Sequence, residues 1–247
     1  METVFTFTHT LQGRDVDLYN RWRLESLFNH MQMAGLEHAE ALGCGYEAML
    51  QRGVAWVLGR VRLEAQYWPG EQETVRIQTW PGPTAHTLFP RYFAIETDAG
   101  RPVARVQTVW AALDLSTRQM RGADSLPCPL PVGEKPEPMP ALHRLVPETE
   151  ETLIRDPVYN DFDRNGHVNN ARYPAWFADG VPLDYQRDHI LTGFQLAYSR
   201  EIRVGSPLAL TYGRRGDGFS CRGGWEDNCY FQAQGLYSPC PESRRQA

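Results

Sequence analysis

The sequence carries, at residues 163–176, the stretch DRNGHVNNARYPAW. Its first part places an acid, an amide and an imidazole at alternate positions (Asp163, Asn165 and His167), and an extended backbone points alternate side chains the same way. Asn169 and Asn170 then favour the start of a helix, because asparagine is a good N-cap residue. A helix start carries unpaired N–H groups and a partial positive charge, which would stabilise an oxyanion. The stretch therefore contains the groups that acyl transfer or hydrolysis requires.

The same residues also have a plainer interpretation. Asp, Asn and Gly are common before helices for local reasons, and a single histidine there can simply hydrogen-bond to its neighbours. The spacing alone leaves a catalytic loop and a structural loop both open.

The order of elements around this stretch occurs twice. In the first half we expect one strand, a helix and four more strands, over residues 4–12, 24–42, 54–68, 73–80, 87–97 and 102–115. In the second half we expect the same order over residues 150–160, 171–179, 190–204, 207–214, 218–225 and 228–237. Seven of the 18 prolines lie between residues 122 and 147, and they predict an extended linker between the halves.

The halves also match residue by residue. DVDLYNRW at 15–22 lies over DFDRNGHV at 161–168 with an offset of 146, which is 161 − 15. Both copies keep the second aspartate, but Tyr19 and Arg21 stand where the second copy has its amide and its imidazole. We therefore predict a duplication in which only the second copy kept its titratable groups.

A further match suggests the counterpart of a glutamate. Glu201 stands four residues before Gly205, as Gln66 stands four residues before Gly70. On this alignment Gln66 is the first-half counterpart of Glu201, and the first half has again lost an ionisable group.

Composition narrows the possible classes of protein. The chain has 247 residues, of which 42% are hydrophobic and 22% charged, as in ordinary globular proteins. No apolar run approaches the roughly eighteen residues of a transmembrane helix, and the N-terminus does not resemble a signal peptide. A net charge of -5 argues against nucleic acid as a partner. Five scattered cysteines indicate a reducing, cytoplasmic compartment, and we expect no metal site and no cofactor.

These motifs resemble those of a known family. GHVNN at 166–170, preceded by Asp163 and followed by Tyr173 and Trp176, is similar to the signature of hot-dog-fold thioesterases. The pattern DxNxH at 163–167, with YxRE at 198–201, resembles plant and bacterial acyl-ACP thioesterases. The resemblance covers nearly the whole chain, including the strand over residues 56–68 and the pairs Thr79-Trp80 and Val109-Trp110.

The resemblance implies an α+β fold called a double hot dog. Two antiparallel sheets would lie in tandem, each wrapped around a central helix. Residues 1–121 would form the N-terminal domain with the acyl-chain pocket, residues 122–148 the linker, and residues 149–247 the C-terminal domain with the catalytic residues.

The resemblance also implies an activity, the hydrolysis of fatty acyl-ACP to free fatty acid and holo-ACP, which ends chain elongation. We expect Glu201 and His167 to activate and orient water as a general-base pair, with the proton acceptor left open. Asn165 and the N–H groups near Asn169 and Asn170 would hold the oxyanion, and Asp163 would position Asn165 or the loop.

One residue departs from the family pattern. Some members carry a cysteine directly after the glutamate, and it has been proposed as a nucleophile. This chain has Ile202 at that position. We therefore expect direct attack by water.

Two further sets of residues follow from the same resemblance. The acyl pocket is expected to be lined by Leu27, Met31, Met33, Trp56, Trp80 and Phe89, although such residues commonly only pack a core. The acidic acyl carrier protein, with its 4'-phosphopantetheine-linked acyl chain, is expected to dock on Arg118, Arg121, Arg144, Arg172 and Arg203.

Other functions stay open at this stage. An acyl-CoA thioesterase of the same fold would differ only in the thiol carrier. A non-catalytic acyl-binding module is a rival of another class, because fold does not fix function. Monomer and homodimer are both open, and family analogy favours the homodimer. We expect no insertion into a membrane.

Overall fold

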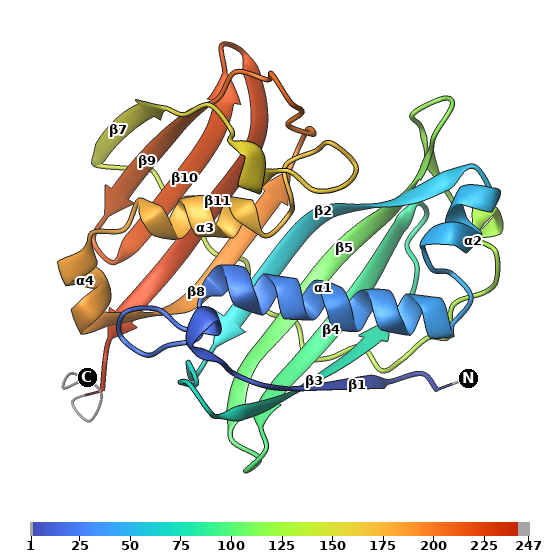
Figure 1. The fold of residues 1–247 in the computed structure, drawn as a ribbon, viewed down its shortest axis with the longest axis horizontal. Helices are drawn as coiled ribbons and strands as arrows, with labels where there is room; N and C mark the ends of the chain where they lie inside the picture. The colour runs from blue at the N-terminus through green and yellow to red at the C-terminus, as the bar shows by residue number, and fades with distance from the viewer. Residues whose placement is uncertain (1, 242–247) are drawn as a thin grey trace.

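The computed structural model describes residues 2–241, which form a long curved sheet with helices on one face (Figure 1). The helices are α1 (Leu24–Ala41), α2 (Tyr46–Gln51), α3 (Arg172–Asp179) and α4 (Leu183–Asp188). The strands of the first half are β1 (Phe5–Thr10), β2 (Val54–Ala65), β3 (Thr74–Pro81), β4 (Leu88–Thr97), β5 (Pro102–Asp114) and β6 (Met120–Arg121). Those of the second half are β7 (Thr149–Ile154), β8 (His189–Tyr198), β9 (Ala209–Arg215), β10 (Gly218–Trp225) and β11 (Asn228–Pro239).

The two predicted sheets are joined edge to edge. Within residues 2–241 an 11-stranded sheet runs β1-β3-β4-β5-β2-β8-β11-β10-β9-β7, with the short β6 paired to β5. Every described pairing is antiparallel, and the joint between the halves is the pairing of β2 residues 60–64 with β8 residues 193–197. The halves therefore share a backbone hydrogen-bond ladder as well as a side-chain core.

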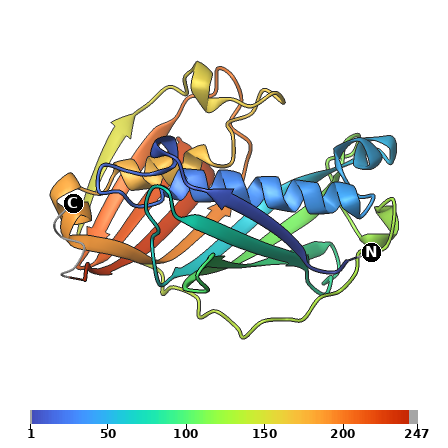
Figure 2. The same ribbon diagram turned by 60° about the horizontal axis from the view of Figure 1, so that its bottom comes forward.

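One long helix covers the first half of the sheet. Most buried residues of α1 lie three or four positions apart, as expected of a helix with one buried face. They are Leu24, Leu27, Phe28, Met31, Ala34 and His38, and Ser26 and His30 are buried as well. In the second half α3 buries Trp176 and Phe177 in the same way. Figure 2 shows both helices on one side of the sheet. No described helix has the length and apolar character needed to cross a membrane.

The proline-rich segment passes over the opposite face of the sheet (Figure 2). Residues 126–148 contain no helix or strand, as prolines in this number predict. Trp80 Nε1 donates to Glu134 O at 2.7 Å, and Arg62 donates to Met139 O at 2.7 Å. Side chains of the outer face thus hold the segment through its backbone carbonyls.

Some predicted boundaries are wrong, and several short elements were not predicted. The strand expected over 190–204 ends at Tyr198, because the N–H groups of residues 199 and 200 both donate to Tyr230 O and the chain then leaves the sheet. The strand expected over 150–160 ends at Ile154. The elements α2, β6 and α4 are short, with six residues or fewer, and their sequences show no sustained period.

The structure repeats its loop geometry at the predicted offset of 146. In each half one aspartate, Asp17 or Asp163, accepts hydrogen bonds on Oδ1 from the N–H groups two and four residues further on. The distances are 2.8 and 3.0 Å in the first half and 2.8 and 3.5 Å in the second. A second aspartate, Asp15 or Asp161, is buried and accepts from the N–H group three residues before it, at 2.9 and 2.8 Å.

The predicted counterpart of Glu201 is wrong. The N–H groups of residues 66 and 67 both donate to Val103 O. In the second half the N–H groups of residues 199 and 200 both donate to Tyr230 O in the same way. The structural offset here is therefore 133, which is 199 − 66. Trp68, rather than Gln66, therefore corresponds to Glu201. The sequence alignment had matched Gly70 with Gly205. In the structure the residue equivalent to Gly205, which has φ 81°, is Gln72, which has φ 67° and adopts the same left-handed conformation.

Candidate active site

The loop from Asp163 to Asn170 is shaped by its own backbone hydrogen bonds. The N–H group of Asp163 donates to His167 O at 2.9 Å, and that of Gly166 donates to Asp163 O at 3.0 Å. Gly166 has φ 75°, a conformation that glycine adopts without strain. Together with the two hydrogen bonds that the carboxylate of Asp163 accepts from the loop, these bonds fix the turn that presents His167.

A second loop brings Glu201 to this histidine. Val168 N–H donates to Ile202 O at 2.8 Å, so the loop that follows β8 lies beside the loop that precedes α3. His167 Nε2 then lies 3.4 Å from Glu201 Oε2. The two side chains are 28% and 27% exposed, which leaves both reachable by a substrate. The structure thus brings together the two residues that the sequence assigned to water activation.

Two arginines also contact Glu201. Arg118 and Arg203 each donate from Nη2 to Glu201 Oε2 at 2.9 Å. Burial raises the pKa of Glu201, but the hydrogen bonds from Arg203 and Arg118 and the charge of His167 outweigh it, so that the pKa is lowered overall. Glu201 is therefore ionised at neutral pH. Both arginines were predicted to dock a carrier protein; the structure places them on this carboxylate, and their docking role stays a prediction.

The N–H groups at the helix start are largely occupied. Asn169 N–H donates to Asp161 O at 2.8 Å, Ala171 N–H to Asn169 Oδ1 at 2.8 Å, and Arg172 N–H to Asn169 O at 2.9 Å. The N-cap residue of α3 is Ala171, so the prediction that Asn169 or Asn170 caps the helix is wrong, and Asn169 instead closes the turn that leads into α3. Asn170, by contrast, lines the cavity described next.

A cavity of about 480 Å³ connects these polar groups to the interior of the first half. Its polar lining comprises Gln32, Arg91, Thr108, Arg118, Asp163, Asn165, His167, Asn170 and Glu201. Most of the remaining lining is apolar and comes from α1, α2 and the strands β2, β4 and β5. An apolar cavity that opens onto a histidine–glutamate pair suits a long hydrocarbon chain with a reactive polar end.

Half of the predicted acyl-pocket residues line this cavity. Met31, Trp56 and Phe89 do, whereas Leu27 is wholly buried in the core and Met33, on the outer side of α1, is 46% exposed. Trp80 is turned to the linker. Sequence reasoning missed Gly35, Ala39, Tyr46 and Met49, because a cavity face of a helix has the same periodicity as a packed face.

The remaining predicted docking arginines have other surroundings. Arg121 lies 3.8 Å from Asp114, and Arg144 is exposed in the linker. Arg172 donates to Asp161 at 2.8 Å and to Glu25 at 2.6 Å, which ties α3 to α1. Its role is therefore structural.

A histidine–aspartate cluster in the first half has the composition of a metal site. The ligand atoms of His9, Asp15 and His30 lie within 4.8 Å of one another. They are already joined by hydrogen bonds, with His9 Nε2 3.0 Å from Asp15 Oδ2 and the Ser26 hydroxyl donating to Asp15 Oδ1 at 2.8 Å. Asp161, the counterpart of Asp15 in the second half, is held in the same way by Arg155 and Arg172. The cluster of His9, Asp15 and His30 therefore has the place of a structural hydrogen-bond network.

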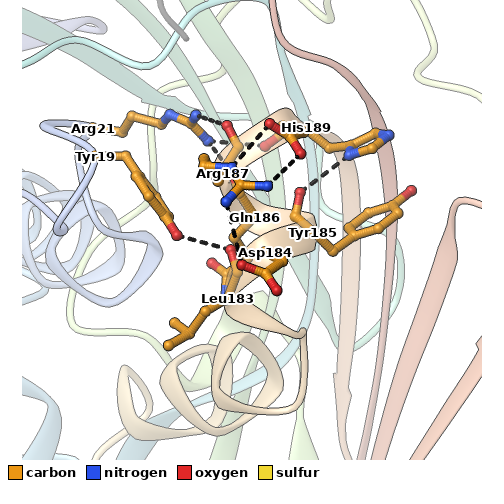
Figure 3. A network of polar contacts seen from close by, with 9 residues as sticks. Tyr19, Arg21, Leu183, Asp184, Tyr185, Gln186, Arg187 and His189 are labelled. Atoms are coloured by element: carbon orange, nitrogen blue, oxygen red, sulfur yellow. Dashed lines mark hydrogen bonds and ion pairs between the residues drawn. The ribbon is translucent and has the colours of Figure 1, made fainter. Parts of the chain in front are cut away.

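The first-half counterpart of the candidate catalytic loop makes structural contacts instead (Figure 3). Arg21, at the position of His167, donates to the carbonyl oxygens of Gln186 at 2.6 Å, Arg187 at 2.8 Å and His189 at 2.8 Å. The Tyr19 hydroxyl, at the position of Asn165, donates to Leu183 O at 2.8 Å. Arg21 therefore caps the C-terminal carbonyls of α4, which have no partner within the helix.

Comparison with known proteins finds two matching family domains and several relatives. Residues 2–123 match the acyl-ACP thioesterase N-terminal domain and residues 147–229 match the acyl-ACP thioesterase C-terminal domain. A chloroplastic acyl-[acyl-carrier-protein] hydrolase of Cuphea viscosissima is 27% identical over 83% of this chain and 53% of its own length. A chloroplastic dodecanoyl-[acyl-carrier-protein] hydrolase of Umbellularia californica is 27% identical over 83% of this chain and 58% of its own length. The chain thus spans about half the length of the curated relatives that it matches.

Solved structures confirm the predicted double hot-dog fold. An acyl-ACP thioesterase from Bacteroides thetaiotaomicron superimposes with a TM-score of 0.78 at 22% identity, over 96% of this chain and 98% of that one. The 12:0-ACP thioesterase from Umbellularia californica gives a TM-score of 0.80 at 22% identity, over 97% and 99%. Since two family domains match in sequence, in the order and over the halves that the structure repeats, the chain belongs to the acyl-ACP thioesterase family.

Proposed function

We propose that this chain hydrolyses the thioester of fatty acyl-ACP and releases free fatty acid and holo-ACP. The observation that carries the proposal is the pair of His167 and Glu201, 3.4 Å apart on the wall of a mainly apolar cavity of about 480 Å³. Membership of the family and the names of its relatives supply the carrier. Carrier docking, cytoplasmic location and oligomeric state stay predictions.

The geometry supports attack by water. His167 and Glu201 hold a water molecule between them and accept its proton as a pair. The water oxygen bonds to the carbonyl carbon of the thioester. The π electrons of the C=O bond move to the carbonyl oxygen, which becomes an oxyanion. The side-chain amides of Asn165 and Asn170 reach the cavity and can donate to that oxyanion.

The tetrahedral intermediate then collapses. The C–S bond breaks, the carboxylic acid forms, and the thiolate of the carrier takes the proton held by the pair. No protein nucleophile is needed, since Ile202 follows Glu201 and is fully buried. Asp163 contributes indirectly, because its carboxylate fixes the loop that carries His167 and Asn165.

The test is thiol release from acyl-ACP and acyl-CoA with the same acyl chain. His167→Ala and Glu201→Gln should each lower kcat by roughly a hundredfold or more, because each removes half of the general-base pair. His143→Ala is the matched control, since His143 is exposed in the linker. Circular dichroism should show that all three variants are folded.

The outcomes separate the proposed function from its rivals. Near-normal turnover by both site variants would refute the mechanism. Turnover of acyl-CoA alone would make the chain an acyl-CoA thioesterase. Binding of fatty acid without turnover of either thioester would make it an acyl-binding module.

A further inference from the structure

The catalytic carboxylate is held by cations from both halves of the chain. Glu201 Oε2 accepts from Arg203, two residues away on its own loop, and from Arg118, 83 residues earlier in the N-terminal half. His167 Nε2 is the third polar atom near the same oxygen. Arg203 belongs to the loop of Glu201 itself, which the bridge between Arg203 and His167 and the hydrogen bond from Val168 N–H to Ile202 O join to the loop of His167. Arg118 is the partner of this carboxylate that comes from the N-terminal half.

Arg118 is presented by a rigid turn between β5 and β6. Asp114 Oδ1 accepts three hydrogen bonds. They come from the N–H group of Ser116 at 3.0 Å, the hydroxyl of Ser116 at 2.7 Å and the N–H group of Thr117 at 2.9 Å. Arg118 N–H donates to Asp114 O at 2.9 Å. The hydrogen bonds from Thr117 and Ser116 lower the pKa of Asp114 to about 2, so this anchor stays ionised.

The backbone of Arg118 is itself unusual. Its φ is 59°, in the left-handed region where a side chain other than glycine is strained. Such strain persists only where surrounding contacts impose it, and it is common at functional sites. The side chain of Arg118 also lines the cavity beside Glu201 and His167. The turn thus aims one arginine at the catalytic pair.

We infer that Arg118 is a positioning residue, through which the N-terminal half holds Glu201 Oε2 against His167. The inference rests on the proposed function and deepens it: both halves are needed to complete the catalytic site. Arg118 does not touch the reacting atoms. It restricts the rotamers of Glu201 and, together with Arg203, lowers the pKa of this carboxyl group against the effect of burial.

The role predicts a kinetic effect. Without Arg118 the carboxylate can turn to Arg203 alone and away from His167. A displacement of about 1 Å in a catalytic group can cost two orders of magnitude in rate, and a partial loss on the order of tenfold in kcat is expected because Arg203 stays in place. Among the described groups, Arg118, Arg203 and His167 contact Glu201, and the buried Tyr173 lies within its electrostatic reach. Losing one cation raises the pKa of Glu201. The acid side of the kcat–pH profile should therefore move to higher pH.

The experiment compares Arg118→Gln with Arg118→Lys on two substrates, acyl-ACP and the matched acyl-pantetheine, which lacks the carrier protein. Arg118→Gln should lower kcat on both substrates and shift the pH profile on both, and lysine should restore part of each effect. Arg76→Gln is the matched control, because the pair of Arg76 and Glu96 has the same 2.9 Å contact and lies outside the cavity. That control should behave as the unmodified protein.

Two results would overturn the inference. A higher KM on acyl-ACP, with acyl-pantetheine unaffected, would make Arg118 a docking residue. An unchanged or faster kcat with an unshifted pH profile would show that the contact is incidental or inhibitory.

A second measurement does not depend on turnover. Carboxyl carbon NMR, with the Glu201 signal assigned by its loss in Glu201→Gln, should show a higher pKa of Glu201 in Arg118→Gln. An unchanged pKa would refute the electrostatic part of the inference. If the unmodified protein hydrolyses no thioester but the Glu201 signal shifts as expected, the proposed function fails while the contact stands.

Discussion

At the scale of single residues, buried aspartates fix the loops of both halves. Asp15 is 5% exposed. Burial raises the pKa of Asp15, but the hydrogen bonds from His9, the Gln12 N–H group and the Ser26 hydroxyl outweigh it and lower the pKa to about 2. These hydrogen bonds are made to the ionised form, so the carboxylate stabilises the folded chain only while it is charged.

This gives a pH dependence of stability with a definite sign. The folded pKa lies below the ordinary value of 3.8, so the contribution is fully present above about pH 4 and is lost as the pH falls towards 2. Asp15→Asn should lower the free energy of unfolding by about 2 kcal/mol at pH 7 and by much less at pH 2. Urea unfolding of the unmodified protein and of Asp15→Asn, at pH 7 and at pH 2, measures this loss of unfolding free energy. A deficit that is equal at the two pH values would contradict it.

Arg21 gives a second prediction at this scale. It is 6% exposed and donates to three backbone carbonyls around the end of α4. Arg21→Ala should lower the free energy of unfolding by roughly 2–4 kcal/mol, because it leaves buried carbonyls without partners. Thiol release per folded molecule should stay near that of the unmodified protein, since Arg21 lies outside the candidate site. A large loss of kcat at full folding would show that this region couples to catalysis.

At the scale of elements, α1 determines the shape of the cavity. Met31, Gly35 and Ala39 lie four residues apart and all line it, so the small side chains at 35 and 39 create room for the substrate. Ala39→Phe should reduce kcat/KM for the longest acyl chains severalfold more than for short ones, because it fills part of that space. A chain-length series of acyl-ACP substrates measures the change. An equal loss at all lengths would place Ala39 outside the acyl path.

The elements also show what the sequence could and could not predict. The helix α1 and the strands β2–β5 follow clear periods, so their existence was predictable. The loop at 163–170 was recognised from its spacing and motif. The position of Glu201 in a loop was not predicted, because its neighbours alternate like a strand. The contact of Arg118 with Glu201 joins segments 83 residues apart, and nothing in local sequence encodes it.

At the scale of the whole molecule, the joint between β2 and β8 makes the halves one structural unit. Residues 60–64 pair with 193–197 in an unbroken register, and Phe28 of α1 packs edge to face on Phe194 of β8. Heating or urea should therefore unfold both halves in a single transition, seen at the same midpoint by circular dichroism and tryptophan fluorescence. Two separated midpoints would show that the halves unfold independently.

The cap that Arg21 makes on α4 also bears on how the chain can evolve. Restoring a histidine at position 21 would remove the guanidinium that satisfies three carbonyls, while Trp68 would still stand where a glutamate is required. A histidine at position 21 should therefore weaken the fold without completing a second histidine–glutamate pair. On the proposed function, the structural contacts of the first-half loop therefore favour a single reaction centre per chain.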